Sequence, residues 1–259
     1  MKKVRPNTYY LLVSFLSAVM IFTAVFANPV QIEAATATQQ KKVLASGKVS
    51  STELYIIDSG KPGPVVMIVG GVHGNEKAGA KAASKFTNLK IIKGKLLVLP
   101  KANKRAVAIN RRTASGGSDL NRSFPKKSKE SADTYISAAI YKTVKDYDVD
   151  WLMDMHEGSD YYKNKRTDSV GQTLIHYPTT RMTSMGKKIV NTLNSNISKS
   201  SRKFTLLKYP VKGSLARSSG QYLGVNAFIF ETSMKQTLAT RINQQEKAAN
   251  TLLKGIGML

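Results

Sequence analysis

Short, continuously apolar segments, each followed by a turn and a helix-forming stretch, constrain the fold of this chain most strongly. Residues 65–69 form an unbroken apolar run that ends at Gly70-Gly71. Such a run is typical of a strand that is covered on both faces of a sheet. The Ala-rich segment 77–88 then predicts a helix, so the local order is strand, glycine turn, helix.

The same alternation continues along the chain and predicts its fold class. Further strands are expected at residues 54–58 (a short edge strand), 95–99, 151–155, 173–177, 204–209 and 225–230. Helices are expected at residues 130–147, 181–197, 214–222 and 236–254. Residues 101–129 show neither period, and a loop of this length inside a compact domain is usually functional. The alternation predicts a three-layer α/β/α sandwich with a mixed, largely parallel central sheet.

The first 37 residues are predicted to be a signal peptide, with an uncleaved N-terminal anchor as the alternative. Positive charge in the first five residues precedes an apolar run over 11–27, and Ala35-Thr36-Ala37 offers a cleavage signal. Residues 38–50 are expected to be a flexible lead-in, and residues 51–259 one folded domain. Export combined with the absence of cysteine predicts a secreted, extracellular or cell-wall-associated protein without disulfides.

The chain is strongly basic, with 40 Lys and Arg against 16 Asp and Glu. Residues 1–37 hold three basic residues and one acidic residue, so the remainder keeps 37 against 15, a net charge of +22. This excess favours an anionic partner such as a cell-wall polymer, and a membrane partner only if the N-terminal segment stays uncleaved. Nucleic acid is not expected, because the basic residues are scattered and no RNA-binding aromatic motif or Cys/His finger is present.

Histidine and carboxylate residues are placed as metal ligands would be. His73 and Glu76 lie three residues apart after the strand predicted at 65–69, where both can turn onto one ion. His156 follows the strand predicted at 151–155 and is one of only three histidines. Two His and one Glu, with a fourth position left to water, are typical of an open catalytic zinc site. Asp154, on the same strand face as His156, is a candidate partner for an imidazole.

Other readings of these residues are plain structural ones. Taken alone, His73 can pack a turn and Glu76 can begin a helix with a favourable charge. Such readings weaken when both segments are considered together, because the chain has so few histidines. The third histidine, His176, has no acidic neighbour in sequence and is expected to be structural or to line the substrate site.

The segment Asp119-Leu120-Asn121-Arg122 in the long loop offers groups for binding a carboxylate. The guanidinium of Arg122 beside the amide of Asn121 makes a planar fork of donors. The upstream pair Arg111-Arg112 offers a second cation where negative charge develops on a carbonyl oxygen. The alternative is a basic loop that meets an anionic polymer.

Glu231 ends the intensely apolar segment 228–230. A carboxylate in such surroundings usually pairs with a cation or takes part in chemistry, because burial without a partner is costly. Near zinc it would take a proton from water and deliver it to a leaving amine. A structural salt bridge is the alternative.

In this order the motifs H-x-x-E, R…D-L-N-R-x-F-P, D-x-H and F-x-F-E resemble the zinc carboxypeptidase superfamily. This superfamily includes the succinylglutamate desuccinylase/aspartoacylase-like deacylases and the murein peptide amidases. The resemblance runs from about residue 52 to the C-terminus and implies a zinc carboxypeptidase-like catalytic domain over residues 51–259. It implies one Zn²⁺ per chain, held by His73, Glu76 and His156.

The resemblance also implies roles for the remaining candidates. Glu231 corresponds to the general base, and Asn121 and Arg122 to the residues that hold the substrate carboxylate. Arg112 is favoured as the group that polarises the carbonyl, with the adjacent Arg111 as the alternative. Tyr209 matches the mobile tyrosine that carboxypeptidases place about twenty residues before the catalytic Glu.

We therefore expect an exported zinc-dependent hydrolase that cleaves an amide bond next to a free carboxylate, on peptides or cell-wall stem peptides. An N-acyl amino acid deacylase is the first alternative, which the motif G-x-H-G-N-E and the short gap between Glu76 and His156 favour. Few residues follow Glu231, where the deacylases continue with a β-rich domain, and this favours the peptidase-like core. A non-catalytic wall-binding protein on the same scaffold is the further alternative.

Overall fold

The computed structural model describes residues 36–259, so the signal peptide predicted at 1–37 lies almost wholly outside the described residues. Within this part, eight strands form one sheet in the order β1-β2-β4-β3-β5-β8-β6-β7. The strands are β1 (Thr38–Leu44), β2 (Thr52–Asp58), β3 (Val65–Gly70), β4 (Lys95–Leu99), β5 (Trp151–Gly158), β6 (Thr173–His176), β7 (Thr205–Lys208) and β8 (Asn226–Ser233). The helices are α1 (Lys77–Ser84), α2 (Lys104–Ala108), α3 (Tyr135–Asp146), α4 (Thr180–Asn194), α5 (Leu215–Leu223) and α6 (Leu238–Gly255), with 3₁₀ turns η1 (Leu120–Arg122) and η2 (Ser200–Arg202).

The centre of the sheet is parallel, and its edges are mixed. Strands β4, β3, β5 and β8 run side by side in the same direction. Strand β2 is antiparallel to both β4 and the edge strand β1, β6 is antiparallel to β8, and β7 is parallel to β6. Every residue of β5 and β8 is buried, as expected for strands covered on both faces. The predicted mixed, largely parallel α/β sheet is confirmed.

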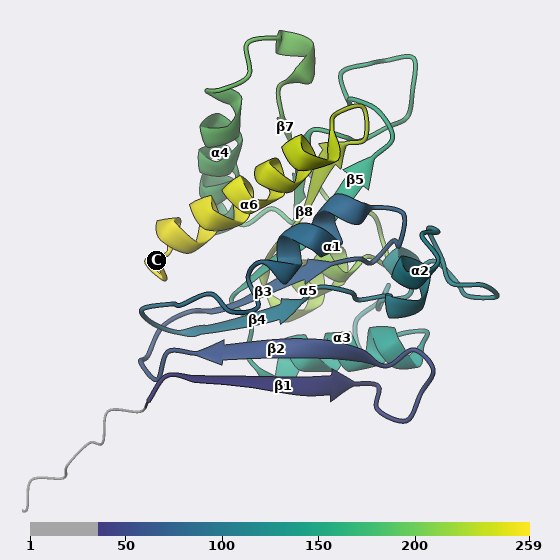
Figure 1. Cartoon of the computed structure of the whole chain (residues 1–259), viewed down its shortest axis with the longest axis vertical. Coiled ribbons are helices and arrows are strands. Elements are labelled where there is room, and N and C mark those ends of the chain that lie inside the picture. Colours follow the sequence, from purple (N-terminus) through teal and green to yellow (C-terminus); the bar gives the residue numbers. More distant parts are fainter. Residues whose placement is uncertain (1–35) are drawn as a thin grey trace, which may run out of the picture. The chain divides into compact units, whose positions relative to one another are not determined.

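Helices cover both faces of this sheet (Figure 1). Helices α1, α4 and α6 pack on one face, where Val66 and Ile68 of β3 enter their apolar core. Helices α3 and α5 pack on the other face, where Met67 and Val69 of the same strand enter a second core. Successive side chains of a strand point to opposite faces, so one apolar run supplies both cores.

Helix α1 lies unusually close to the sheet because of Gly79. A Cβ atom at this position would be only 2.4 Å from the carbonyl oxygen of Met155 in β5. Glycine therefore permits a close approach that a larger residue would prevent. The approach brings the residue before α1, Glu76, next to β5.

The structure corrects the sequence prediction at three places. Residues 38–50 are not a flexible lead-in, because residues 38–44 form edge strand β1, paired with β2 over its whole length. Consequently β2 is not an edge strand, as residues 54–58 were predicted to be. The long polar segment 101–129 is not a continuous loop, because it contains α2 and η1.

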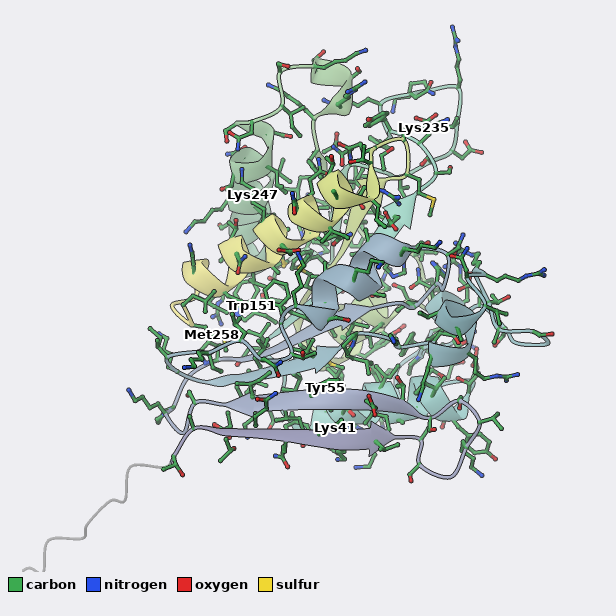
Figure 2. All side chains as sticks on the ribbon, in the orientation of Figure 1. Lys41, Tyr55, Trp151, Lys235, Lys247 and Met258 are labelled. Atoms are coloured by element: carbon green, nitrogen blue, oxygen red, sulfur yellow. The ribbon has the colours of Figure 1, made fainter. Side chains whose placement is uncertain are left out.

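The positive charge is spread over the molecule. Figure 2 shows Lys41, Lys235 and Lys247 extending from different parts of the fold, while Trp151 and Met258 are almost fully buried. Among residues 36–259, no helix combines the length and the apolar character needed to cross a membrane.

Candidate functional site

Three predicted ligands from separate parts of the chain converge at the carboxyl ends of the central strands. His73 follows β3, Glu76 directly precedes the first turn of α1, and His156 lies in β5. One side-chain atom from each lies within 4.8 Å of the other two, and all three residues are buried. The Nδ1 atoms of His73 and His156 lie 2.6 Å and 2.9 Å from the two carboxylate oxygens of Glu76. The predicted convergence is therefore present.

Two further carboxylates flank the imidazoles on their outer sides. Asp154 Oδ2 lies 3.1 Å from His156 Nε2, as the shared strand face predicts. Asp119 Oδ1 lies 2.9 Å from His73 Nε2, a contact that the sequence did not reveal. A carboxylate on the far nitrogen of a metal-binding imidazole fixes its orientation and raises its basicity.

The charges of this centre favour a bound cation. Burial raises the pKa of Glu76, but His156 and His73 outweigh burial and lower it to about 2. Burial lowers the pKa of His156, but Asp154 and Glu76 outweigh it and hold this pKa well above its ordinary value. His156 Nε2 and Asp154 Oδ2 form a buried ion pair without the geometry of a hydrogen bond, and Asp154 Oδ1 is buried without a hydrogen-bond partner. Two imidazoles among several buried carboxylates are a donor set that suits Zn²⁺, so the residues present fit the metal that the resemblance implies.

Glu231 lies beside this cluster. It is the strand neighbour of His156 across the β5–β8 pair, and its side chain is buried with Oε2 unpartnered. Burial raises the pKa of Glu231 to about 8, and Glu76 and Asp154 act in the same direction. A divalent cation nearby would lower this pKa and favour the carboxylate form, which can accept a proton.

The two adjacent arginines differ in their surroundings. Arg112 Nη2 donates to Asp119 Oδ2 at 2.9 Å, and Arg112 Nη1 lies 3.6 Å from Glu76 Oε1. Arg111 is exposed and forms no ion pair within the described part of the chain. The structure thus brings Arg112 to the cluster and leaves Arg111 outside it.

The segment with the predicted carboxylate-binding residues is anchored by Asp119. The Asp119 side chain accepts the backbone N–H of Asn121 and so caps η1. Asn121 is buried with Oδ1 unpartnered, whereas Arg122 is exposed and donates to the Asn121 carbonyl oxygen at 2.9 Å. Asn121 and Arg122 therefore follow Asp119, which contacts His73, by two and three residues along the chain.

Tyr209 lies on a neighbouring segment and is exposed. It has a positive φ of 62°, and the Arg217 guanidinium lies 5.2 Å from its ring centroid. Downstream, the Gly213 carbonyl accepts the backbone N–H of Phe124, just after η1. The tyrosine segment therefore runs beside the predicted carboxylate-binding loop, although within residues 36–259 no hydrogen bond or ring contact joins Tyr209 to the His-Glu-His group. His176 is fully buried in β6, which agrees with a structural role.

The sequence prediction missed the residues that support the cluster from behind. Glu157 accepts the backbone N–H of Ala78 at 2.8 Å and pairs with Arg241 of α6 at 2.5 Å. The Glu157 backbone N–H in turn donates to Glu76 Oε2 at 3.0 Å. Gln245, also on α6, donates to the His156 carbonyl oxygen. Glu157 could have been singled out, because it is an acidic residue next to His156 in a chain with few acidic residues. The sequence of α6 contains no motif that would have indicated Arg241 or Gln245.

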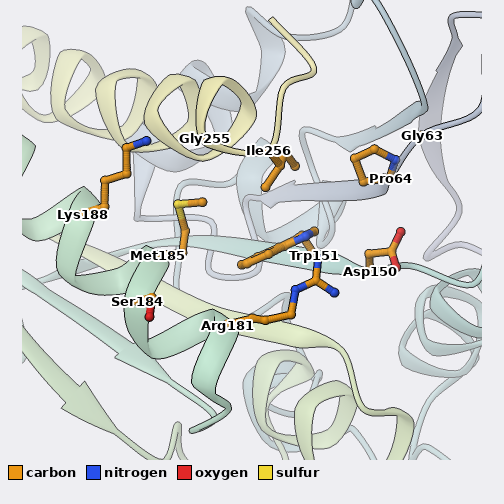
Figure 3. Close-up of a pocket in the computed structure, with 10 residues that line it drawn as sticks. All are labelled: Gly63, Pro64, Asp150, Trp151, Arg181, Ser184, Met185, Lys188, Gly255 and Ile256. Carbon is orange, nitrogen blue, oxygen red and sulfur yellow. The ribbon is translucent and has the colours of Figure 1, made fainter.

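A separate hollow of about 630 Å³ lies around Trp151, with Arg181 and Met185 on its wall (Figure 3). The Arg181 guanidinium lies 5.5 Å from the Trp151 ring centroid. Trp151 begins β5 whereas His156 lies near its carboxyl end, so the two places are at opposite ends of the strand. Ligands of open α/β sheets bind beyond the carboxyl ends of the strands, which favours the His-Glu-His end as the functional site.

Solved structures share this fold at low sequence identity. A cell shape determinant protein from Helicobacter pylori, described as a D,L-carboxypeptidase in its mDAP-bound form, matches with a TM-score of 0.62 and 20% identity over 76% of this chain and 52% of that chain. A succinylglutamate desuccinylase/aspartoacylase from Rhodobacter sphaeroides matches with a TM-score of 0.65 and 16% identity over 88% and 68%. A product-bound ectoine utilization protein from Ruegeria pomeroyi matches with a TM-score of 0.63 and 17% identity over 86% and 68%. The chain thus spans about half the length of the Helicobacter protein.

Sequence comparison places the chain more narrowly. No curated protein sequence matches it significantly. The profile of the succinylglutamate desuccinylase/aspartoacylase catalytic domain, however, matches residues 62–254, which is well over half of the chain. This match includes all the motif residues and confirms the resemblance derived from them. The chain therefore belongs to the succinylglutamate desuccinylase/aspartoacylase catalytic domain family.

Proposed function

We propose that this protein is a zinc-dependent hydrolase that cleaves an amide bond next to a free carboxylate. The observation that carries the proposal is the convergence of His73, Glu76 and His156, with Glu231 on the adjacent strand. A metal site, a buried carboxylate and a nearby cationic side chain are the groups that amide hydrolysis by water requires.

The side chains divide the reaction between them. His73, Glu76 and His156 would hold Zn²⁺, which when bound supplies a Lewis acid and makes water easier to deprotonate. Glu231 takes the proton of the attacking water and delivers it to the nitrogen of the leaving amine. Arg112 donates to the carbonyl oxygen as negative charge develops there, and Asp119 holds its guanidinium in position.

The substrate carboxylate sets the position of the scissile bond. Asn121 and Arg122 offer the N–H groups of an amide and of a guanidinium at η1 as donors to a carboxylate. Tyr209, on the exposed neighbouring segment, can close over the bound substrate by rotation of its side chain. We favour a C-terminal amino acid of a peptide, including a cell-wall stem peptide, as the leaving group.

An N-acyl amino acid is the second candidate substrate. The match to the desuccinylase/aspartoacylase domain favours it, since those names describe removal of an acyl group from an amino acid. Both substrates present an amide beside a carboxylate, so the residue roles are the same. The difference lies in whether the released amino acid was the C-terminal residue of a peptide or carried a simple acyl group on its nitrogen.

We also propose that the protein acts outside the cell, in the medium or at the cell wall. The support is the sequence of residues 1–37, with basic residues, an apolar run and a cleavage signal. An anionic wall polymer is then a natural neighbour for a domain of net charge +22.

A substrate panel with the variant Glu231→Gln tests the proposed reaction. The panel contains peptides with a free C-terminus, the same peptides amidated, stem peptides and N-acyl amino acids. We expect hydrolysis only of compounds with the free carboxylate, and a loss of at least about 100-fold in kcat for Glu231→Gln, because general base catalysis contributes about 10²–10⁴-fold. The matched control is Glu53→Gln on β2, whose carboxylate pairs with Lys41.

The outcomes separate the remaining classes. Turnover of peptides but not acyl amino acids supports the carboxypeptidase reading, and the reverse supports the deacylase reading. About one zinc per chain without turnover of any compound would favour the non-catalytic wall-binding protein. Near-normal activity of Glu231→Gln would remove Glu231 from the proposed mechanism.

A further inference from the structure

A groove beside α1 carries four lysines and no acidic side chain. Its volume is about 740 Å³, and helices α1, α2 and α6 and the segment after β4 contribute to its walls. Its apolar part consists of Gly74, Ala80, Val107 and Ile242. The charged side chains are Lys77, Lys81, Lys85 and Lys101.

Three of these lysines form a row along α1 and its C-cap residue, Lys85. Lys77, Lys81 and Lys85 are spaced four residues apart, so they share one side of the helix at intervals of about 6 Å along its axis. Like charges at this spacing repel each other, and a cation in the first turn opposes the helix dipole. No acidic residue in the first turn of α1 offsets these costs. A bound anion would.

Few acidic groups compensate these charges within the described residues. Lys85 pairs with Glu246 of α6 at 2.5 Å. Within residues 36–259, Lys77, Lys81 and Lys101 form no ion pair, and all three are exposed. The groove therefore offers at least three cations to a ligand without breaking an existing contact.

The row extends into a second hollow of about 160 Å³. This hollow shares Ser84 and Lys101 with the first and adds Lys104. Glu53 at its edge already pairs with Lys41 at 3.1 Å. The two hollows together form what we call the lysine groove, defined by Lys77, Lys81, Lys85, Lys101 and Lys104.

The lining indicates the chemical class of the ligand. Lysine binds phosphate as a point charge, whereas recognition of a planar carboxylate favours the arginine fork, and no arginine lines either hollow. The main hollow contains no aromatic ring and the second hollow only Tyr55, so successive bases would find no row of rings on which to stack, which argues against single-stranded nucleic acid. The length of the charged row argues for a chain of phosphates over a single small anion.

We propose that the lysine groove binds an anionic polymer that carries phosphate groups along a flexible backbone without bases. The groove includes Gly74 and Lys77, the sequence neighbours of His73 and Glu76, so its wall adjoins the segment that carries two residues of the His-Glu-His group. Binding there would hold the protein where polymer-linked substrates are concentrated. The inference goes beyond the proposed reaction, and polymer binding does not depend on turnover.

Binding of poly(glycerol phosphate) to the full chain tests the proposal, measured by fluorescence anisotropy at several salt concentrations. The protein carries Glu231→Gln, so that hydrolysis cannot affect the result. The groove variant adds Lys77→Gln, Lys81→Gln and Lys101→Gln. The control variant adds Lys145→Gln, Lys187→Gln and Lys199→Gln, which remove the same charge from exposed sites elsewhere.

We expect the groove variant to lose at least about tenfold in affinity and to show a salt dependence shallower by about two units of log Kd per log salt, because about 0.7 units are lost per phosphate contact on a flexible chain. The control should change by less than about threefold. Equal losses in both variants would overturn the proposal in favour of diffuse charge attraction.

Two further ligands distinguish the classes of anion. Oligo-dT that binds more tightly than poly(glycerol phosphate) would identify a nucleic-acid surface, and equal binding of polyglutamate would remove the preference for phosphate. Circular dichroism checks that the variants fold. If the triple variant unfolds, Lys81→Gln and Lys101→Gln singly must each weaken binding more than Lys187→Gln, or the proposal fails.

Discussion

Neighbouring side chains in this protein differ sharply in what they touch, and Arg111 and Arg112 are the clearest case. Arg112 bridges Asp119 and the region of Glu76, whereas Arg111 is exposed and forms no ion pair within the described residues. The sequence could not separate them, because both lie in a segment without a helical or strand period. Asp119 decides between them, since one carboxylate contacts both the imidazole of His73 and a single guanidinium.

Substitution of the two arginines makes this difference measurable. We expect Arg112→Ala to lower kcat/KM by about 100-fold or more, because a donor to the developing oxyanion is lost. Arg111→Ala should change kcat/KM by less than about threefold. Steady-state kinetics on the best substrate of the panel, with zinc content measured for both variants, provides the comparison. A larger effect for Arg111 would reverse the assignment.

The elements that were easiest to predict are those buried on both faces. Strand β4 begins and ends where its apolar run does, and β3 differs by one residue. Strands β5 and β8 extend three residues beyond their predicted ends, because the polar residues from His156 and Glu231 onward continue the sheet pairing. Strand β1 was missed because its composition, Thr-Gln-Gln-Lys-Lys, is polar on both faces. Lysine-rich edges of this kind discourage pairing with other chains and carry no apolar pattern.

The close packing of α1 on β5 at Gly79 can be tested by substitution. We expect Gly79→Ala to destabilise the fold by about 1–3 kcal/mol, because the added methyl group would meet the Met155 carbonyl oxygen at 2.4 Å. The control is Gly186→Ala in α4, where the new methyl group meets only side-chain ends, the nearest being that of Leu206. There the higher helix propensity of Ala, worth about 1 kcal/mol, offsets the crowding.

Urea unfolding of both variants, together with zinc affinity, measures the effect. Zinc affinity should fall for Gly79→Ala, because a shift of α1 moves Glu76, and should stay unchanged for Gly186→Ala. Equal stability of the two variants would show that α1 can move away from β5 without cost.

At the scale of the whole molecule, the centre joins parts that are distant in sequence. His73 and Glu76 lie between β3 and α1, and His156 belongs to β5. Helix α6 holds the end of β5 in place through its contacts with Glu157 and with the His156 carbonyl oxygen. The sequence motifs predicted the three candidate ligands, since zinc sites without cysteine use His and carboxylate residues. Arg241 and Gln245 could not be predicted, because many polar residues on a helix would fit the same pattern.

Metal removal tests this linkage. We expect chelation to abolish hydrolysis and to lower Tm, with both restored by Zn²⁺, because a ligand that binds only the folded state stabilises it by about 2.7 kcal/mol at 100 times its Kd. Calorimetry with and without added Zn²⁺ gives the shift. His73→Ala should show no such shift, and a shift of the same size in this variant would place the metal elsewhere.

The position of Asp119 has a practical meaning for how such proteins diversify. Asp119 contacts the imidazole of His73 and also caps η1, where the predicted carboxylate-binding residues lie. Leu120 and Phe124 of the same segment are buried in one of the two cores. A new substrate preference is therefore expected to arise through the exposed Arg122, since exchange of the whole segment would also disturb the His-Glu-His group and the packing beneath it.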